Sequence, residues 1–233
     1  YIGQRMLQQT FYGGAKVRYQ ANGQALHAKE PGSWTVDADL QCKKVLVKRR
    51  KLVIEGNRLY FIYDKKVNRL KPYLGPKAEI DIETGNGPVS ISALQHDIAN
   101  VFMTGQERLV DFVPSYWKPF LLQPDKQVHK MALGPLSAGR GRVTPPKLLL
   151  KRAPPSTPEA RNAGLHGTMI LSIIVGKKGR VTRPSIIRPL GLGLDDSAAR
   201  TVEKWKFEPA TRGGKPVAVR ERIEVSFVIR SGG

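Results

Sequence analysis

The chain has 233 residues and a formal net charge of +20 at pH 7, with 39 Lys and Arg against 19 Asp and Glu. This length allows one large domain or two small ones, and an apolar fraction of 40 % is sufficient for the core of a soluble fold. A single cysteine, Cys42, excludes an internal disulfide framework and a multi-cysteine zinc site. The apolar runs have the length of strands and fall short of the roughly 18 residues of a membrane-spanning helix.

Residues 1–120 are predicted to form an α+β domain of mostly antiparallel β structure with a helical C-terminal part. Alternating apolar and polar residues form short runs that are separated by turn signals at residues 21–23 and 55–57, which is typical of hairpins. Residues 33–40 indicate a further short strand. From residue 92 to residue 102 the apolar positions recur with helical spacing, which predicts a helix.

Three aromatic residues stand near the end of this domain. Tyr116, Trp117 and Phe120 follow a short amphipathic segment at residues 107–112 and lie between Pro114 and the next segment of the chain. We interpret them as an aromatic lid that closes the first domain, rather than as part of a ligand-binding site.

Residues 121–155 are predicted to be a linker. The segment is rich in proline and carries seven basic residues against one acidic residue. Proline fixes the φ angle and favours extended backbone, so we expect a semi-extended, basic linker. Within it, Lys-Leu-Leu-Leu-Lys at residues 147–151 could add a strand to a neighbouring domain.

Residues 156–233 are predicted to form a compact domain of strands and helices. Ser156 stands three residues before Glu159, which is the spacing of a capping box, and a short helix follows. Residues 167–175 are almost continuously apolar, which indicates a strand with both faces buried. Residues 181–188 form the returning strand, and Asp195 or Asp196 is expected to cap a second helix.

The last strand, at residues 217–230, alternates strictly between apolar and polar side chains. Glu221 is the single polar residue on the inner side, which indicates a bulge or an edge position. Two interpretations stay open from the residues alone. The strand either pairs within its own sheet or dimer, or offers a sheet edge that recruits a partner strand by β-augmentation.

No pattern of residues predicts catalysis. The four histidines lack the spacing and the neighbouring acids of a metal site, and no glycine-rich segment has the spacing and lysine of a phosphate loop. Cys42 has no evident histidine partner and is expected to be a buried, inert thiol. We therefore expect a non-enzymatic protein with no catalytic residues, no cofactor and no bound metal.

A series of motifs runs through residues 145–230 in a specific order. They are Pro-Glu-Ala-Arg at 158–161, Ala-Gly-Leu-His-Gly at 163–167, Gly-Arg-Val at 179–181, Lys-Trp-Lys-Phe at 204–207, Pro-Ala at 209–210 and Gly-Lys-Pro-Val at 214–217. In order and spacing they resemble the C-terminal domain of the TonB energy-transducer family. The Trp-x-Phe-x-Pro-Ala run after a capped helix is the most specific part of this resemblance.

The resemblance implies a fold and a cellular role. The fold would be a two-layer domain in which a small antiparallel sheet packs against two helices. The domain would lie in the periplasm and bind the TonB box, an extended segment of an outer-membrane TonB-dependent receptor. Energy would come from a proton-driven motor complex in the inner membrane, so a membrane anchor is expected before Tyr1. A homodimer is possible, and nucleic acid is not an expected partner.

The resemblance also indicates which residues would bind the partner. Ser156 and Thr157, which stand where the family usually has Gln and Tyr before the helix proline, would flank the docking groove. The last strand would present its backbone edge. The predicted partner-binding residues are Ser156, Thr157, Arg220, Arg222, Ile223, Glu224, Val225, Ser226 and Phe227. Trp205 and Phe207 are expected to be core anchors.

An alternative is a structural protein of the cell envelope. In this interpretation the TonB-like domain docks on a partner that is not a receptor, and the basic first domain holds acidic wall polymer or anionic lipid. The densest basic cluster consists of Lys43, Lys44, Lys48, Arg49, Arg50 and Lys51. It indicates either a solvated strand end and turn or an electrostatic contact with an anionic surface.

Overall fold

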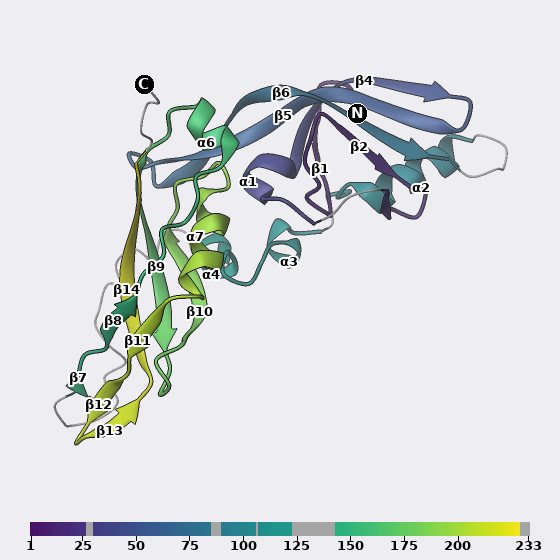
Figure 1. Ribbon diagram of the computed structural model, residues 1–233. Helices are drawn as coiled ribbons and strands as arrows, with labels where there is room; N and C mark the ends of the chain where they lie inside the picture. The colour runs from purple at the N-terminus through teal and green to yellow at the C-terminus, as the bar shows by residue number, and fades with distance from the viewer. Residues whose placement is uncertain (27–29, 85–89, 106, 123–142, 229–233) are drawn as a thin grey trace. The chain divides into compact units, whose positions relative to one another are not determined.

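A computed structural model describes residues 1–26, 30–84, 90–105, 107–122 and 143–228 (Figure 1). Its backbone divides into two compact units, one formed by Tyr1–Ile62 and Leu70–Phe112 and the other by Tyr63–Arg69 and Val113–Gly233. Strands and helices both occur, so the predicted α+β class is confirmed. Most of the predicted linker and the last residues of the predicted final strand lie outside the described residues.

The first unit is built on a six-stranded sheet with the order β1-β4-β5-β6-β2-β3. The strands are β1 (Arg5–Leu7), β2 (Lys16–Tyr19), β3 (Ala25–Leu26), β4 (Asp39–Lys48), β5 (Lys51–Asp64) and β6 (Arg69–Glu83). Its helices are α1 (Trp34–Asp37), α2 (Ile91–Val101) and α3 (Leu109–Phe112). The pairing of β2 with β6 is parallel, whereas β1 with β4, β4 with β5, and β2 with β3 are antiparallel.

The core of this unit forms between the sheet and α2. The helix predicted at residues 92–102 is confirmed as α2, and Ser90 caps it by accepting a hydrogen bond of 3.1 Å from the Ala93 amide. Ile98 and Phe102 at the end of this helix are buried with apolar residues of β2, β4, β5 and β6. Tyr19 is fully buried in this core, and its hydroxyl donates a hydrogen bond of 2.6 Å to Oε1 of Gln8.

Two expectations for this unit are wrong. Residues 33–40 are not one strand, because Ser33 caps the four-residue helix α1 and its amide also donates to the Asp37 carboxylate. Residues 55–57 are not a turn, because β5 runs through them from Lys51 to Asp64. A Cβ on Gly56 would lie 2.3 Å from the Gln41 carbonyl oxygen of β4, so this glycine allows close strand approach rather than a turn.

The second unit is built on a three-stranded antiparallel sheet with the order β10-β9-β14 (Figure 1). The strands are β9 (Gly167–Val175), β10 (Val181–Arg188) and β14 (Val219–Phe227). The central strand β9 is buried at almost every position from Met169 to Val175, as its apolar sequence predicted. Both of its faces are therefore covered by other parts of the unit.

Two smaller sheets accompany the main one. In the first, β8 (Lys147–Leu150) pairs with β11 (Lys206–Glu208), so the strand predicted at residues 147–151 is confirmed. In the second, β12 (Ala210–Arg212) pairs with β7 (Val143–Thr144) and with β13 (Lys215–Val217). Trp205 and Phe207 are buried, which confirms them as core residues, and Nε1 of Trp205 donates a hydrogen bond of 2.9 Å to the Arg152 carbonyl.

The helices of this unit are α4 (Lys118–Leu122), α6 (Pro158–Asn162) and α7 (Leu194–Val202). Two predicted caps are wrong. Thr157, not Ser156, caps α6, since its hydroxyl accepts a hydrogen bond of 3.2 Å from the Ala160 amide. The residue before α7 is Gly193, and Asp195 accepts hydrogen bonds from the amides of the preceding loop instead. No helix among the described residues is long and apolar enough to cross a membrane.

The aromatic lid was also assigned wrongly. Residues 116–122 belong to the second compact unit, where α4 packs against β10 and the Ile186 amide donates a hydrogen bond of 2.9 Å to the Tyr116 carbonyl. Trp117 is fully buried there, and its indole donates a hydrogen bond to Asp196 of α7. The prediction assigned these aromatic residues to the domain that precedes them in the chain. Their hydrogen-bond partners instead lie about 70 to 80 residues later in the sequence.

Candidate functional site

The outer edge of β14 is the candidate site. β14 pairs with β9 over nine consecutive residues, from Val219 opposite Val175 to Phe227 opposite Gly167, without a register shift. Among the residues that the structure describes, β9 is the only strand beside it. In an antiparallel strand, alternate residues direct their backbone amide and carbonyl groups to opposite edges. The edge away from β9 therefore carries backbone groups that can pair with an added strand.

The other edge of the same sheet, formed by β10, is less regular. β10 contains two register shifts, one between Thr182 and Ser185 and one between Ile186 and Arg188. Arg183 within the first of them has a φ angle of 50°, which interrupts the extended backbone. The Ile186 amide is already bonded to the Tyr116 carbonyl, and α4 packs against this strand. The longer regular edge is thus that of β14.

The side chains of β14 alternate between the interior and solvent. Val219, Val225 and Phe227 are buried, whereas Arg222, Glu224 and Ser226 are exposed. The apolar side chains hold the strand on its sheet, and the polar ones are available to a partner. The position of Glu221 is explained by the edge, since the pairing has no bulge there.

Glu221 and Ile223 lie on the inner face of β14, where solvent still reaches their side chains. Both side chains are half-buried. Burial raises the pKa of the Glu221 carboxyl. An added strand would cover these two positions further, because it would lie along the same edge of the sheet.

Two arginines give the exposed face of β14 its charge. Arg220 and Arg222 make no ion pair with another residue in the described part of the chain, and the Nε atom of Arg220 is shielded from solvent without a hydrogen-bond partner there. Ser226 is tied to the neighbouring strand by a hydroxyl–hydroxyl contact of 2.9 Å with Thr168. Thr168 was not predicted from sequence, since no local pattern marks a partner 58 residues away.

Ser156 and Thr157 lie at the start of α6, and their observed bonds join α6 to itself and to the loop before α7. The Thr157 hydroxyl accepts from the Ala160 amide and donates a hydrogen bond of 2.6 Å to the Leu192 carbonyl. The Ser156 carbonyl accepts a hydrogen bond from Arg161. The structure thus places seven of the nine predicted site residues on one strand and gives Thr157 a capping and tethering role.

The described residues contain no group of three or more His, Cys, Asp or Glu that could hold a metal ion. Cys42 is a buried free thiol, and burial raises its pKa. The arrangement of β14 is suited to binding through backbone hydrogen bonds and side-chain charge.

Comparison with known proteins identifies the C-terminal part of the chain. Residues 157–229 match the family described as "Gram-negative bacterial TonB protein C-terminal". Protein TonB of Vibrio cholerae is 32 % identical over 87 residues, which cover 36 % of this chain and 36 % of that protein. Protein TonB of Xanthomonas campestris pv. campestris is 35 % identical over 77 residues, or 33 % of this chain and 34 % of that protein. The predicted resemblance is confirmed, and this part of the chain is a TonB-like C-terminal domain.

The matches are partial. The chain spans about a third of the length of the curated relatives that it matches. A solution NMR structure of the Pseudomonas aeruginosa TonB C-terminal domain is 23 % identical and gives a TM-score of 0.31, covering 38 % of this chain and 90 % of that one.

Proposed function

We propose that this chain, whose residues 157–229 form a TonB-like C-terminal domain, is a non-enzymatic periplasmic protein that binds a partner segment as an added strand on β14. The partner would be the TonB-box-like segment of an outer-membrane TonB-dependent receptor. Binding would couple energy from an inner-membrane proton-driven motor complex to transport through that receptor. The proposal is supported by the family match and by two relatives named TonB.

The observation that carries the proposal is the regular edge of β14. Nine residues in unbroken register give an incoming strand a continuous row of backbone partners. Val225 and Phe227 would keep the edge in place from the interior, since both are buried. Such a contact has few side-chain anchors, so we expect weak and transient binding.

Charged side chains would select the partner and its register. Arg220 and Arg222 favour acidic or polar side chains on the incoming segment, and Glu224 favours a basic one. The same charges oppose pairing with arbitrary strands, which is how exposed edges avoid aggregation. Ser156 and Thr157 would contribute at the start of α6, with Thr157 acting through the helix that it caps.

Two neighbouring proline substitutions test the edge directly. Arg222→Pro and Ile223→Pro each remove one backbone donor, and alternation means that one donor points to β9 and the other to the free edge. Proline is tolerated at an edge position whose donor faces outward. We expect one variant to fold and lose binding to a receptor N-terminal peptide, and the other to lose the strand itself.

The measurement is peptide titration of the full chain by calorimetry, with circular dichroism as the check on folding. Arg220→Ala should weaken peptide binding and leave the fold intact, because its side chain lies on the partly exposed face. Thr211→Ala on β12 serves as a control outside the edge. Unchanged peptide affinity in a folded variant whose outward donor has been removed would contradict strand addition at β14.

A further inference from the structure

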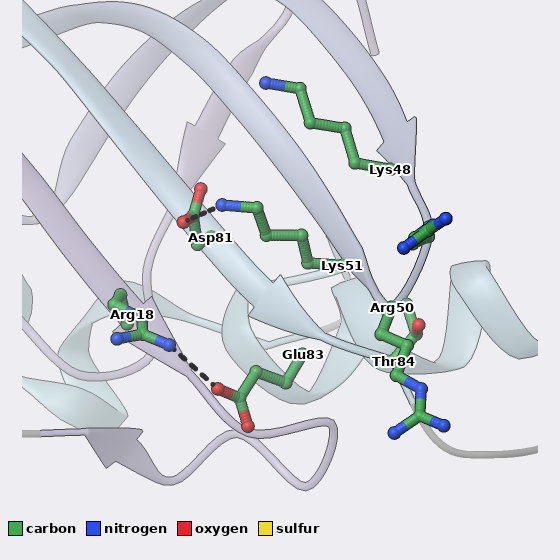
Figure 2. Close-up of a pocket in the computed structure, with 8 residues that line it drawn as sticks. Arg18, Lys48, Arg50, Lys51, Asp81, Glu83 and Thr84 are labelled. Carbon is green, nitrogen blue, oxygen red and sulfur yellow. Dashed lines mark hydrogen bonds and ion pairs between the residues drawn. The ribbon is translucent and has the colours of Figure 1, made fainter.

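A basic pocket lies in the first compact unit and has no place in the function proposed above. It has a volume of about 480 Å³ and is formed where the turn between β4 and β5 meets β2 and the end of β6 (Figure 2). The lining residues are Arg18, Lys48, Arg49, Arg50, Lys51, Asp81, Glu83 and Thr84. This volume is within the usual range for small-ligand sites.

The two acids of the pocket are already neutralised. Asp81 forms ion pairs with Lys51 at 2.7 Å and with Lys16 at 3.2 Å, and Glu83 forms one with Arg18 at 3.1 Å. Figure 2 shows the Lys51–Asp81 and Arg18–Glu83 contacts on one side of the pocket. Burial alone would raise the pKa of the Asp81 carboxyl, but hydrogen bonds from Lys51 and Lys16 hold it below its ordinary value. Asp81 therefore stays ionised and keeps Lys51 in position.

Three cationic side chains of the pocket are not used in ion pairs with other described residues. Lys48, Arg49 and Arg50 are exposed and make no ion pair with any other described residue. They follow one another around the β4–β5 turn, and the Thr84 amide fixes the turn by donating a hydrogen bond of 2.9 Å to the Arg50 carbonyl. Five basic and two acidic side chains line the pocket, so it attracts anions.

A second pocket of the same unit provides a comparison. It has a volume of about 550 Å³ and is lined by three basic side chains, Lys43, Lys44 and Lys77, against the two acids Glu55 and Glu79. It contains no arginine. Its excess of positive charge is smaller, so size alone does not distinguish the two pockets, whereas charge and donor type do.

We propose that the pocket at the β4–β5 turn binds a phosphate group. A phosphate monoester carries about two negative charges and three strong acceptor oxygens, whereas a carboxylate carries one charge and two oxygens. The planar guanidinium groups of Arg49 and Arg50 can each donate two parallel hydrogen bonds to such a group. Lys48, Lys51 and Thr84, which also line the pocket, carry further donor groups.

The phosphate could belong to a soluble phosphate ester or to the headgroup of an anionic lipid. The full-length chain is therefore titrated with glycerol phosphate and, separately, with phosphatidylcholine vesicles that contain no phosphatidic acid, a lipid with a phosphate monoester headgroup, or about one third of it. Binding is measured at two salt concentrations, since contacts of exposed charges weaken with ionic strength.

Two charge-matched variants decide whether the pocket itself binds. Lys48→Gln/Arg49→Gln/Arg50→Gln removes the three unpaired cations of the pocket. Lys43→Gln/Lys44→Gln/Lys77→Gln removes the same charge from the second pocket. We expect the first variant to bind the phosphate probe at least about tenfold more weakly and the second to bind nearly as well as the unchanged chain.

The possible results distinguish a soluble phosphate ester from a lipid headgroup, and both from the absence of a phosphate site. Binding of glycerol phosphate that the first variant alone loses supports a soluble phosphate site. Binding only to vesicles with phosphatidic acid, again lost in the first variant alone, supports a lipid headgroup as the source. Equal weakening by both variants, or binding of neither probe, overturns the proposal. Binding of a receptor peptide to β14 is unaffected by any of these results, so the two proposals fail independently.

Discussion

Nε1 of Trp117 donates a hydrogen bond of 3.0 Å to Oδ1 of Asp196, a residue 79 positions later in the chain. The hydroxyl of Tyr116 donates a second bond, of 2.8 Å, to the same oxygen. Trp117 is fully buried, and Asp196 stands in the first turn of α7. The negative charge of Asp196 also raises the pKa of the Tyr116 hydroxyl, after the larger effect of burial. Two consecutive aromatic residues are thereby fastened to α7.

This relationship predicts coupled losses of stability. Trp117→Phe and Tyr116→Phe each remove one donor to the buried Asp196 carboxylate, so each should cost about 1–3 kcal/mol of unfolding free energy. Because both donors use one oxygen, the cost of the double variant should differ from the sum of the single costs. Urea unfolding followed by far-ultraviolet circular dichroism measures all three. Strict additivity would show that the two bonds act independently.

The buried carboxyl of Asp195 predicts an unusual pH dependence. Burial raises its pKa to about 7, and the amide hydrogen bonds from Leu190 and Gly191 only partly oppose this rise. Since its ordinary pKa is 3.8, the folded chain binds a proton that the unfolded chain lacks between about pH 4 and pH 7. The contribution of this group to stability is therefore full below about pH 4 and is lost as pH rises to about 7.

Asp195→Asn should abolish this loss of stability with rising pH, so the difference in stability between the unchanged chain and the variant should itself change between about pH 4 and pH 7. It should also lower stability, because the Leu190 and Gly191 amides bond to different oxygens of the carboxyl, and the amide NH2 group that replaces one of these oxygens cannot accept. Glu208→Gln, which neutralises an exposed acid of β11, is the control. Thermal melts between pH 4 and pH 8 provide the comparison, and a slope retained in Asp195→Asn would rule out this carboxyl as its source.

The turn at Gly179 predicts a large effect of a single methyl group. Gly179 has a φ angle of +71°, and an added Cβ would lie 1.8 Å from the Phe207 carbonyl oxygen. Gly179→Ala should therefore cost more than the roughly 1–2 kcal/mol of the left-handed backbone alone. Gly213→Ala is the matched control, since Gly213 has a φ of +54° and nothing within 4 Å of an added Cβ. Equal unfolding free energies for the two variants would contradict the close approach.

Substitutions at Thr157 test whether this residue only stabilises α6 or also contacts the partner. Thr157→Ala removes the cap of α6 and the bond to the Leu192 carbonyl, and should cost about 1–2 kcal/mol. Thr157→Ser keeps the hydroxyl and should restore most of this stability. If Thr157 acts only through α6, the Ser variant also binds a receptor peptide normally. A Ser variant that is stable but binds poorly would show that the threonine methyl contacts the partner.

Local signals in the sequence predicted some features and misplaced others for identifiable reasons. The Asn-Gly turn before β3 formed as predicted, since Gly23 adopts a φ of +81° and its amide bonds to the Gln20 carbonyl. Gly56, in the Glu-Gly-Asn run that was also predicted to be a turn, instead allows β4 and β5 to approach closely. Ser156 has the spacing of a cap, yet Thr157 takes the role, since its hydroxyl accepts from the Ala160 amide and also donates to the Leu192 carbonyl.

The amino-acid sequence by itself determined the α+β class, the apolar central strand at residues 167–175 and the relationship of the C-terminal part to TonB-like domains. These depend on periodicity and motif order, which are properties of neighbouring residues. Only the tertiary structure decided that β14 has one strand neighbour among the described residues, that Trp117 is bonded to Asp196 and that Asp81 neutralises Lys51 in the basic pocket. Each depends on which distant segments pack together, and that choice is made by burial and hydrogen bonding over the whole chain rather than by local pattern.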